Sequence, residues 1–458
     1  MNFKYILCAL ILTVFFQKSP AQIHKGELLK IDTFLNEEYP KDQPGAVVLI
    51  AQEGKITYKE AFGLANLKKK KPLQTDMIFQ IGSMTKQFTS AAILQLVEQD
   101  KLSLEDPIQK YVEYYPQKEY ALTIDHLLSQ TSGIPEFFDI DENEFHILLQ
   151  EHTPRALIEY YADKPLLFEP GTQFQYSSSN YPLLGVVIEK VSGLSLKEYF
   201  KKNLFQPLGM NATSLWYTDD FKKKQIPNGY WTKHGALKLS PEIVGSTVYA
   251  QGGIVSTVDD LFIWNQALKN RTFISDYIVN KLTTEKTTVD GQGTGYGYGF
   301  FIKNLQGRRT IQHGGLIYGF TSSGLYLPEE DIFVCILANK SHERTEQVAD
   351  YLASIVIGNP IHILGKSALN YEAKKEYLGT YQMTGNDAKV IEIKLIDDLM
   401  ILDFPNAPGT RVEIVSVNED MFKSVKANIE ITFSRDEEGN VTGFTGKQEE
   451  TFDWVKIK

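Results

Sequence analysis

A serine and a lysine three residues apart are the residues of this chain best placed to do chemistry. The segment Ser83-Met84-Thr85-Lys86 precedes an apolar run from Phe88 to Val97, which predicts a helix. Side chains at this spacing share one helix face, about 5–6 Å apart at Cβ, so the amine can reach the hydroxyl. A serine hydroxyl needs such a base to become a nucleophile, and a helix N-terminus favours developing negative charge. The motif could supply a nucleophile, a base and part of an oxyanion site, although the same spacing also arises by chance.

A second polar cluster, Tyr176-Ser177-Ser178-Ser179-Asn180, lies just before a predicted helix over residues 181–191. Polar residues at a helix start are usually caps. Tyr176 could instead act as a base or proton relay. For that role its pKa would have to fall from about 10 toward neutrality, which a nearby Lys86 ammonium could bring about.

A third motif, His313-Gly314-Gly315, follows the apparent strand 309–311. A histidine at a strand end is more often structural than catalytic. Glycines directly after a strand, however, let a ligand approach the backbone closely. His313 could then bind a carboxylate or carbonyl of the substrate, and it would hold a carboxylate by charge only near or below a pKa of about 6.5.

The elements that would position these motifs follow two patterns. Up to about residue 357, helical stretches alternate with strand-like runs, and Gly358-Asn359-Pro360 interrupts them. In later segments, apolar and polar residues alternate, and residues 390–404 and 429–444 are each predicted to form a hairpin. This pattern is typical of an all-β module. We expect a signal peptide over 1–21, a main domain over 25–357, a linker over 358–370 and an all-β accessory domain over 371–458.

Composition limits the possible functions. The chain has 458 residues, 43% of them hydrophobic and 23% charged, which is typical of a globular protein of two or three domains. Its net charge of −10 argues against a nucleic-acid partner. Residues 5–16 form an apolar stretch too short to span a bilayer, and small residues around Ala21 fit a cleavage site. We therefore expect export to the periplasm or the medium, and no stable membrane span.

Taken together, the three motifs resemble those of the penicillin-recognising serine hydrolases, in the branch with class C β-lactamases, D-alanyl-D-alanine carboxypeptidases and related esterases. That branch carries S-x-x-K, Y-x-N and then K-T-G or H-x-G, in this order. Four flanking segments also resemble the family: 127–133, 207–210, 251–253 and 319–320. The resemblance implies an α/β fold of the β-lactamase/transpeptidase type, with a mainly antiparallel sheet, flanking helices and a helical subdomain. The C-terminal part resembles lipocalin-like β-barrels.

The resemblance also implies roles for single residues. Ser83 would be the nucleophile, assisted by Lys86 and Tyr176. The backbone N–H groups of Ser83 and Leu316 would form the oxyanion hole. Ser178, His313, Gly314 and Gly315 would contact the substrate. Ser178 replaces the usual asparagine, and Ser178-Ser179-Asn180 also fits the S-x-N of other superfamily members.

Three functions remain open at this stage. The first is a hydrolase of D-amino-acid or peptidoglycan-derived peptides. The second is a broad esterase or weak β-lactamase, and the third is a non-enzymatic sensor that binds β-lactams or peptidoglycan. Because His313 stands where class C β-lactamases carry lysine, we expect poor β-lactam turnover. The chain has no H-E-x-x-H, cysteine cluster or G-x-S-x-G, so we expect no metal or other cofactor and no α/β-hydrolase fold. The sequence leaves the oligomeric state open.

Overall fold

The computed structural model describes residues 23–137, 147, 149–215, 226–363, 365, 367–396, 398–405, 411–424, 429–448 and 450–458. The predicted signal peptide lies outside these residues. A six-stranded antiparallel sheet forms the centre of the larger domain, in the order β10-β11-β12-β13-β1-β2. Its strands are β1 (Ala46–Gln52), β2 (Lys55–Phe62), β10 (Phe301–Leu305), β11 (Arg308–Ile317), β12 (Phe320–Leu327) and β13 (Ile332–Ala338).

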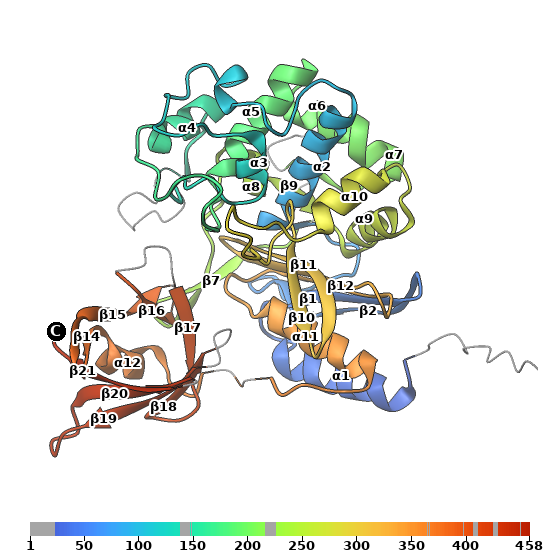
Figure 1. The fold of residues 1–458 in the computed structure, drawn as a ribbon. Coiled ribbons are helices and arrows are strands. Elements are labelled where there is room, and N and C mark those ends of the chain that lie inside the picture. Colours follow the sequence, from blue (N-terminus) through green and yellow to red (C-terminus); the bar gives the residue numbers. More distant parts are fainter. Residues whose placement is uncertain are drawn as a thin grey trace, which may run out of the picture.

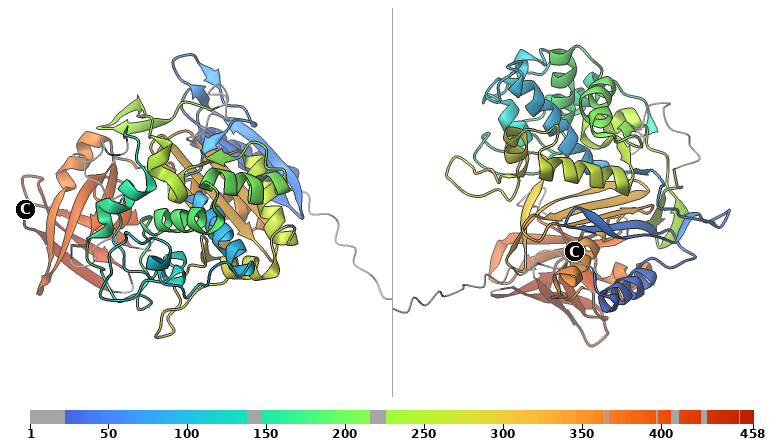
Figure 2. Two further views of the ribbon diagram at one scale, coloured as in Figure 1. Left: turned by 90° about the horizontal axis from the view of Figure 1, so that it is seen from above. Right: turned by 90° about the vertical axis from the view of Figure 1, so that its right-hand side faces the viewer.

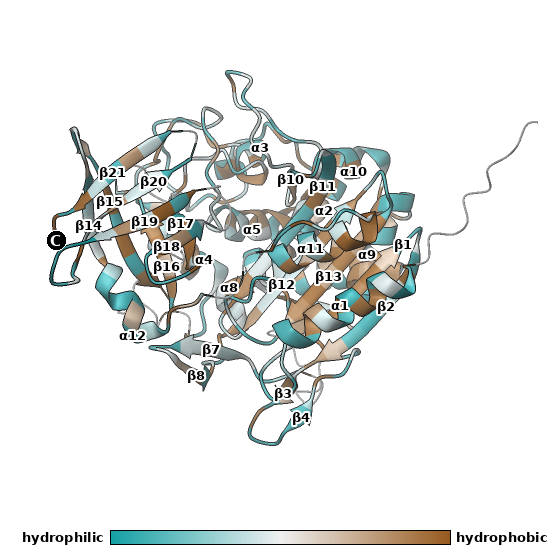
Figure 3. Cartoon of the chain, turned by 90° about the horizontal axis from the view of Figure 1, so that it is seen from below, coloured by the Kyte–Doolittle hydropathy of each residue, from teal (hydrophilic) through white to brown (hydrophobic). Residues whose placement is uncertain are grey.

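The central strands are buried on both faces because both faces are covered by helices. Val48 and Ile50 of β1 pack with one hydrophobic cluster, whereas Val47 and Leu49 pack with another. This alternation is the period of two that a strand imposes on its side chains. The neighbouring strand β13 carries hydrophobic colour along its length (Figure 3), and all of its residues are buried.

Two groups of helices cover the sheet (Figures 1 and 2). The helices α1 (Lys25–Glu38) and α11 (Thr345–Ile357) pack on one face. The opposite face meets α2 (Thr85–Glu98) and α9 (Val258–Asn270), with a helical region beyond them. That region and its connections include α3 (Ile124–Leu128), α4 (Pro154–Ala162), α5 (Asn180–Ser192), α6 (Leu196–Phe200), α7 (Gln206–Leu208), α8 (Gly245–Gly252) and α10 (Asp276–Thr283).

Local sequence signals set several helix ends. Thr123 caps α3 through a hydrogen bond from the His126 N–H to its hydroxyl. Gly193 ends α5 in the left-handed conformation, with φ of 71°. Short strands complete the domain: β3 (Leu64–Asn66), β4 (Lys71–Pro72), β5 (Phe79–Gln80), β6 (Ser214–Leu215), β7 (Tyr230–Lys233), β8 (Ala236–Leu239) and β9 (Ile254–Ser256).

The C-terminal part is a closed antiparallel barrel of eight strands. These are β14 (Gly379–Met383), β15 (Asn386–Ile396), β16 (Leu399–Asp403), β17 (Arg411–Ser416), β18 (Met421–Ser424), β19 (Glu430–Arg435), β20 (Val441–Lys447) and β21 (Thr451–Lys456). A short helix, α12 (Tyr371–Lys374), precedes it, and a separate aromatic cluster around Tyr377, Phe422 and Phe433 fills its interior. The predicted fold class is confirmed, while the domain boundaries stay predictions.

The turn of the β7–β8 hairpin touches the barrel. The Gly235 N–H donates to the Asp398 carboxylate at 2.9 Å, and the His234 ring lies 5.8 Å from that of Tyr371. Figure 1 shows β7 reaching toward the barrel strands. Within the residues described, no helix is long and apolar enough to cross a membrane.

Candidate active site

Ser83 lies in a single 3-10 turn, Gly82–Met84, that leads directly into α2. Gly82 has φ of +52°, and a Cβ atom there would lie 2.9 Å from the Leu316 backbone nitrogen. Glycine therefore lets this turn lie against the backbone of β11. The sequence places Ser83 at the head of a helix, and the structure adds this tighter turn before it.

Lys86 is completely buried and lies between three oxygen atoms. Its Nζ is 3.0 Å from Ser83 Oγ, 3.0 Å from the Gln251 carbonyl oxygen and 3.4 Å from Ser178 Oγ. Burial lowers the pKa of Lys86 from 10.5 to about 7, and the negative charge of Glu136 opposes this fall. A large fraction of Lys86 is therefore neutral at pH 7, and the neutral amine can accept the Ser83 proton.

Tyr176 joins the same group, but in a different protonation state from the one the sequence suggests. The Lys86 Nζ lies 5.1 Å from the centre of its ring, and its hydroxyl has Ser83 as a hydrogen-bond partner. Burial raises the pKa of Tyr176 well above 10, and the hydrogen bond with Ser83 only partly offsets this rise. The expectation that Lys86 lowers this pKa toward neutrality is wrong, because desolvation of the phenolate dominates. Tyr176 is a phenol at neutral pH, so it can donate or relay a proton.

Ser178 also lies beside Lys86. Tyr176 and Ser178, which begin the two alternative readings of this motif (Y-x-N and S-x-N), therefore both lie near the same amine. The Ser178 backbone N–H donates to Glu136 Oε2 at 2.7 Å. Asn180 is buried away from this amine: its side chain accepts from the Ser132 hydroxyl and donates to Gln130 Oε1, both at 2.6 Å. Ser178 is therefore a second candidate proton carrier, and Asn180 is structural.

Three residues that position or charge the site are missed by the sequence reasoning. Gln130 Oε1 accepts the Ser177 N–H at 2.9 Å, which fixes the segment that follows Tyr176. Gln251 offers its carbonyl to Lys86 just after α8 departs from helical geometry at Tyr249. Glu136 contributes negative charge beside Lys86. The first two lie in flanking segments that resemble the family, but nothing in the local sequence singles out Glu136.

His313 differs from expectation in position and in charge. Strand β11 runs through to Ile317, so His313 and the glycines lie within a strand and not at its end. A Cβ atom on Gly315 would lie 2.0 Å from the Ile81 carbonyl oxygen, and one on Gly314 would lie 2.3 Å from the Glu346 carboxylate. These glycines therefore let the strand pass close to its neighbours.

The His313 ring is buried among aromatic side chains, with ring centres 5.3 Å away in Phe301 and 6.0 Å away in Tyr176. Burial, together with the nearby Lys86 charge, lowers the pKa of His313 from 6.5 to about 3. The expectation that His313 titrates near 6.5 and then holds a carboxylate by charge is wrong. The ring is neutral throughout the physiological range.

Leu316 follows these glycines, with its side chain 48% exposed and its backbone beside Gly82. The oxyanion-hole role of the Ser83 and Leu316 N–H groups stays a prediction, as do the substrate contacts of Ser178, His313, Gly314 and Gly315. In the described part of the chain, no group of three or more histidine, cysteine or acidic side chains has a metal-binding arrangement.

Comparisons with known proteins found a matching family model and similar chains. Residues 35–357 match the family model described as Beta-lactamase. The chain is 26% identical over 424 residues to Penicillin-binding protein 4* of Bacillus subtilis (strain 168), covering 87% of this chain and 92% of that protein. It is 28% identical to the octameric penicillin-binding protein homologue from Pyrococcus abyssi, with a TM-score of 0.68 and coverage of 94% and 98%. D-amino acid amidase from Ochrobactrum anthropi SV3 shares the fold, with 19% identity, a TM-score of 0.62 and coverage of 73% and 99%.

Proposed function

Because the chain belongs to the Beta-lactamase family, we propose that it is a serine hydrolase that forms an acyl-enzyme on Ser83. The observation that carries this proposal is the Lys86 amine, buried 3.0 Å from Ser83 Oγ with a pKa of about 7. Such an amine is matched to general-base work at neutral pH. Burial disfavours the charged form of the lysine, so it would not stabilise the fold if the role of Lys86 were purely structural.

The proposed reaction has two halves. Neutral Lys86 takes the Ser83 proton while Oγ bonds to the substrate carbonyl carbon. The leaving group then departs with a proton that reaches it from Lys86 through Tyr176 or Ser178. In the second half, a water gives a proton to the same amine and attacks the acyl carbon. The bond between that carbon and Ser83 Oγ then breaks, Lys86 returns the proton to Oγ, and the carboxylic acid is released. Two backbone N–H groups, on Ser83 and Leu316, would stabilise the tetrahedral oxyanion, and losing one such donor costs about 10²–10³ in rate.

For the substrate we propose D-amino-acid amides and peptides with a free amino group, including peptidoglycan-derived ones. Glu136 adds negative charge beside Lys86, which favours a substrate ammonium. His313 is uncharged and buried, so it offers no fixed positive charge to the carboxylate of a β-lactam or a C-terminal peptide. The likeness to D-amino acid amidase shows a shared fold, and the substrate class rests on these charges.

A matched substrate panel tests this proposal. We would compare D-phenylalaninamide with N-acetyl-D-phenylalaninamide, in which acetylation removes the amine charge and adds a small acyl group. The panel also includes p-nitrophenyl acetate, N-acyl-D-Ala-D-Ala and a chromogenic cephalosporin. We expect kcat/KM for the free amine to exceed that for its acetylated partner by about tenfold, the usual worth of a charged hydrogen bond. Ser83→Ala should abolish turnover of every substrate. Best activity on the acetate ester would favour the esterase alternative, and best activity on the cephalosporin would favour a β-lactamase.

Covalent labelling tests the reaction class independently of the substrate. Fluorophosphonate treatment followed by mass spectrometry should place the adduct on Ser83. An adduct on another serine, or active protein with none, would contradict the mechanism. We also propose that the protein acts outside the cytoplasm, which fractionation of cells that express the full chain would test.

A further inference from the structure

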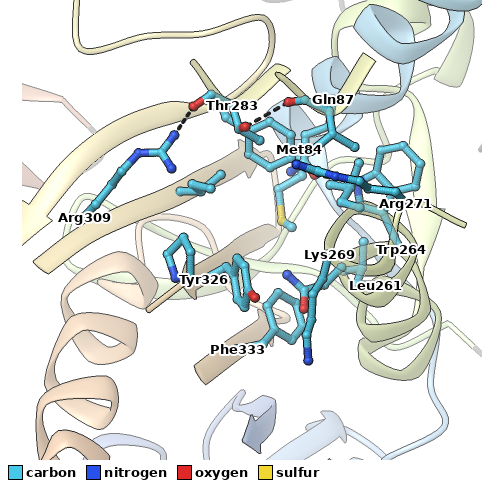
Figure 4. A pocket seen from close by; sticks show the side chains of 17 residues that line it. Met84, Gln87, Leu261, Trp264, Lys269, Arg271, Thr283, Arg309, Tyr326 and Phe333 are labelled. Atoms are coloured by element: carbon cyan, nitrogen blue, oxygen red, sulfur yellow. Dashed lines mark hydrogen bonds between the residues drawn. The ribbon is translucent and has the colours of Figure 1, made fainter. Parts of the chain in front are cut away.

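A cavity of about 460 Å³ lies between α2, α9, α10 and the strands β11–β13 (Figure 4). Met84 and Gln87 line it from the segment that carries the nucleophile. Met84 directly follows Ser83, and Gln87 directly follows Lys86. Because a helix has 3.6 residues per turn, Met84 and Gln87 point in a different direction around the axis from Ser83 and Lys86. Ser83, Lys86, Tyr176 and His313 are not part of the lining. A ligand here would touch the same segment as the substrate without occupying the candidate active site.

Most of this cavity wall is apolar. Leu261, Leu268, Val279, Ile311 and Phe333 all contribute to it. Two polar atoms of the inner wall pair with each other: Trp264 Nε1 donates to Gln87 Oε1 at 2.9 Å. The volume lies within the range of about 300–1,000 Å³ that small-molecule sites occupy. It is about three times the roughly 150 Å³ that holds one benzene in an engineered cavity, so a body of roughly ten carbons fits.

The charged part of the lining has one sign. Lys269, Arg271 and Arg309 contribute to it, and among the described residues that line the cavity there is no aspartate or glutamate. Lys269 pairs with Asp331 and Arg271 with Asp276, each at 2.5 Å, and neither carboxylate lines the cavity.

Arg309 differs from the other two cations, because its hydrogen-bond partner among the described residues is a neutral carbonyl. Its guanidinium donates to the Thr283 carbonyl, and Figure 4 shows this pair at one end of the cavity. Arg309 is exposed at the start of β11, so a ligand carboxylate meeting it there keeps much of its contact with water. Guanidinium groups match carboxylates well, since they can form two parallel hydrogen bonds.

We propose that this cavity binds a free single-chain monocarboxylic acid of about ten carbons, with its chain in the apolar interior and its carboxylate on Arg309. The proposal does not depend on the proposed hydrolase function, since it uses none of the candidate catalytic residues. It assigns a second small-molecule site that faces a different side of this helical segment from the candidate catalytic residues.

Calorimetric titration with decanoate, below its micelle concentration, tests the proposal on the full chain. We expect one binding site per chain. Arg309→Gln should weaken binding by about tenfold or more, the usual effect of losing a charged hydrogen bond. Arg308→Gln is the matched control: Arg308 is the neighbouring residue, pairs with Glu330 and does not line the cavity, so its change should stay within twofold. Decan-1-ol should bind at least tenfold more weakly than decanoate.

The position of the chain can be tested separately. A decanoate carrying bromine at its far end should quench the fluorescence of Trp264, and Trp264→Phe should remove that quenching while calorimetric binding persists. Val279→Phe should fill the interior and prevent binding, with a far-UV circular dichroism spectrum and a cooperative thermal melt like those of the unmodified protein as the check that the variant folds. No one-to-one binding of decanoate, equal binding of decanol, or an unchanged affinity in Arg309→Gln would each overturn the proposal.

Discussion

Lys86 and His313 are two buried bases at one site, and their comparison explains which of them can work. Burial lowers both pKa values by a similar amount, from 10.5 to about 7 for Lys86 and from 6.5 to about 3 for His313. Because the starting values differ, only the lysine reaches the physiological range. The Lys86 charge also disfavours a charged His313. In a dry site, therefore, a lysine can serve as the neutral-pH base, while a histidine becomes a permanently neutral ring.

The largest effect should come from removing the base. Lys86→Met should lower kcat/KM by at least about 10³, because general-base work and the proton route are both lost. In the unmodified protein, kcat/KM should rise with pH through about 7, as Lys86 loses its proton. A pH–rate profile on a neutral ester checks this. A flat profile between pH 5.5 and 8.5 would contradict the assignment.

The same substitution should stabilise the fold. The folded pKa of Lys86 lies below the unfolded value, so the unfolded state binds more protons between pH 7 and 10.5. Stability of the unmodified protein therefore rises with pH in this window, and the penalty for burying Lys86 is largest below pH 7. Lys86→Met should raise the free energy of unfolding by about 3 kcal/mol more at pH 6 than at pH 9. Thermal melts at both pH values measure this, with the exposed Lys190→Met as control.

The next effect separates the two proton carriers that face Lys86. Tyr176→Phe should lower kcat by about 10²–10³, because the phenol is a hydrogen-bond partner of Ser83. Ser178→Ala should cost about tenfold, since its hydroxyl lies 3.4 Å from the amine. Combining Tyr176→Phe with Lys86→Met should be little worse than Lys86→Met alone, because both serve one proton transfer.

Single-turnover kinetics of these variants would test this ranking, with Tyr296→Phe as a control beside His313. A larger loss in Ser178→Ala than in Tyr176→Phe would assign the relay to the serine. Additive losses in the logarithm of the rate would mean that Lys86 and Tyr176 have separate roles.

A smaller effect is expected from the charge that moderates Lys86. Glu136→Gln keeps an oxygen for the Ser178 N–H but removes the negative charge. Glu136 raises the pKa of Lys86, so the variant should shift the rising limb of the pH–rate profile to lower pH, by less than one unit. Glu346→Gln is the matched control, because Glu346 raises the pKa of His313 and not that of Lys86. A shift toward higher pH would contradict the charge assignment.

The sequence predicts the parts of this site that depend on local pattern. Ser83 and Lys86 are predicted from their spacing on one helix, and the sheet and barrel from alternation and family motifs. Protonation states could not be predicted in this way. The phenol of Tyr176 and the neutral ring of His313 depend on burial by segments far away in the chain, such as β10 with Phe301. Glu136 also reaches the site through a loop whose sequence follows no helical or strand period.

The smallest effect should come from His313, and it tests the other half of the comparison. Its neighbours include Lys86, Glu346, Lys303 and the rings of Tyr176, Tyr296 and Phe301, and burial outweighs their combined influence on its pKa. The His313 ring stays neutral above pH 5. Its titration should therefore cause no pH dependence in KM for a carboxylate-bearing substrate. His313→Gln, which keeps polar atoms without a titrating group, should leave kcat/KM within about threefold. His313→Lys should instead destabilise the fold, because a second buried ammonium would face Lys86. The test is to measure KM for a carboxylate-bearing substrate between pH 5 and 8, in the unmodified protein and in His313→Gln. If KM rises through pH 6.5 in the unmodified protein and is flat in His313→Gln, then His313 carries a charge below that pH, and the contrast with Lys86 is wrong.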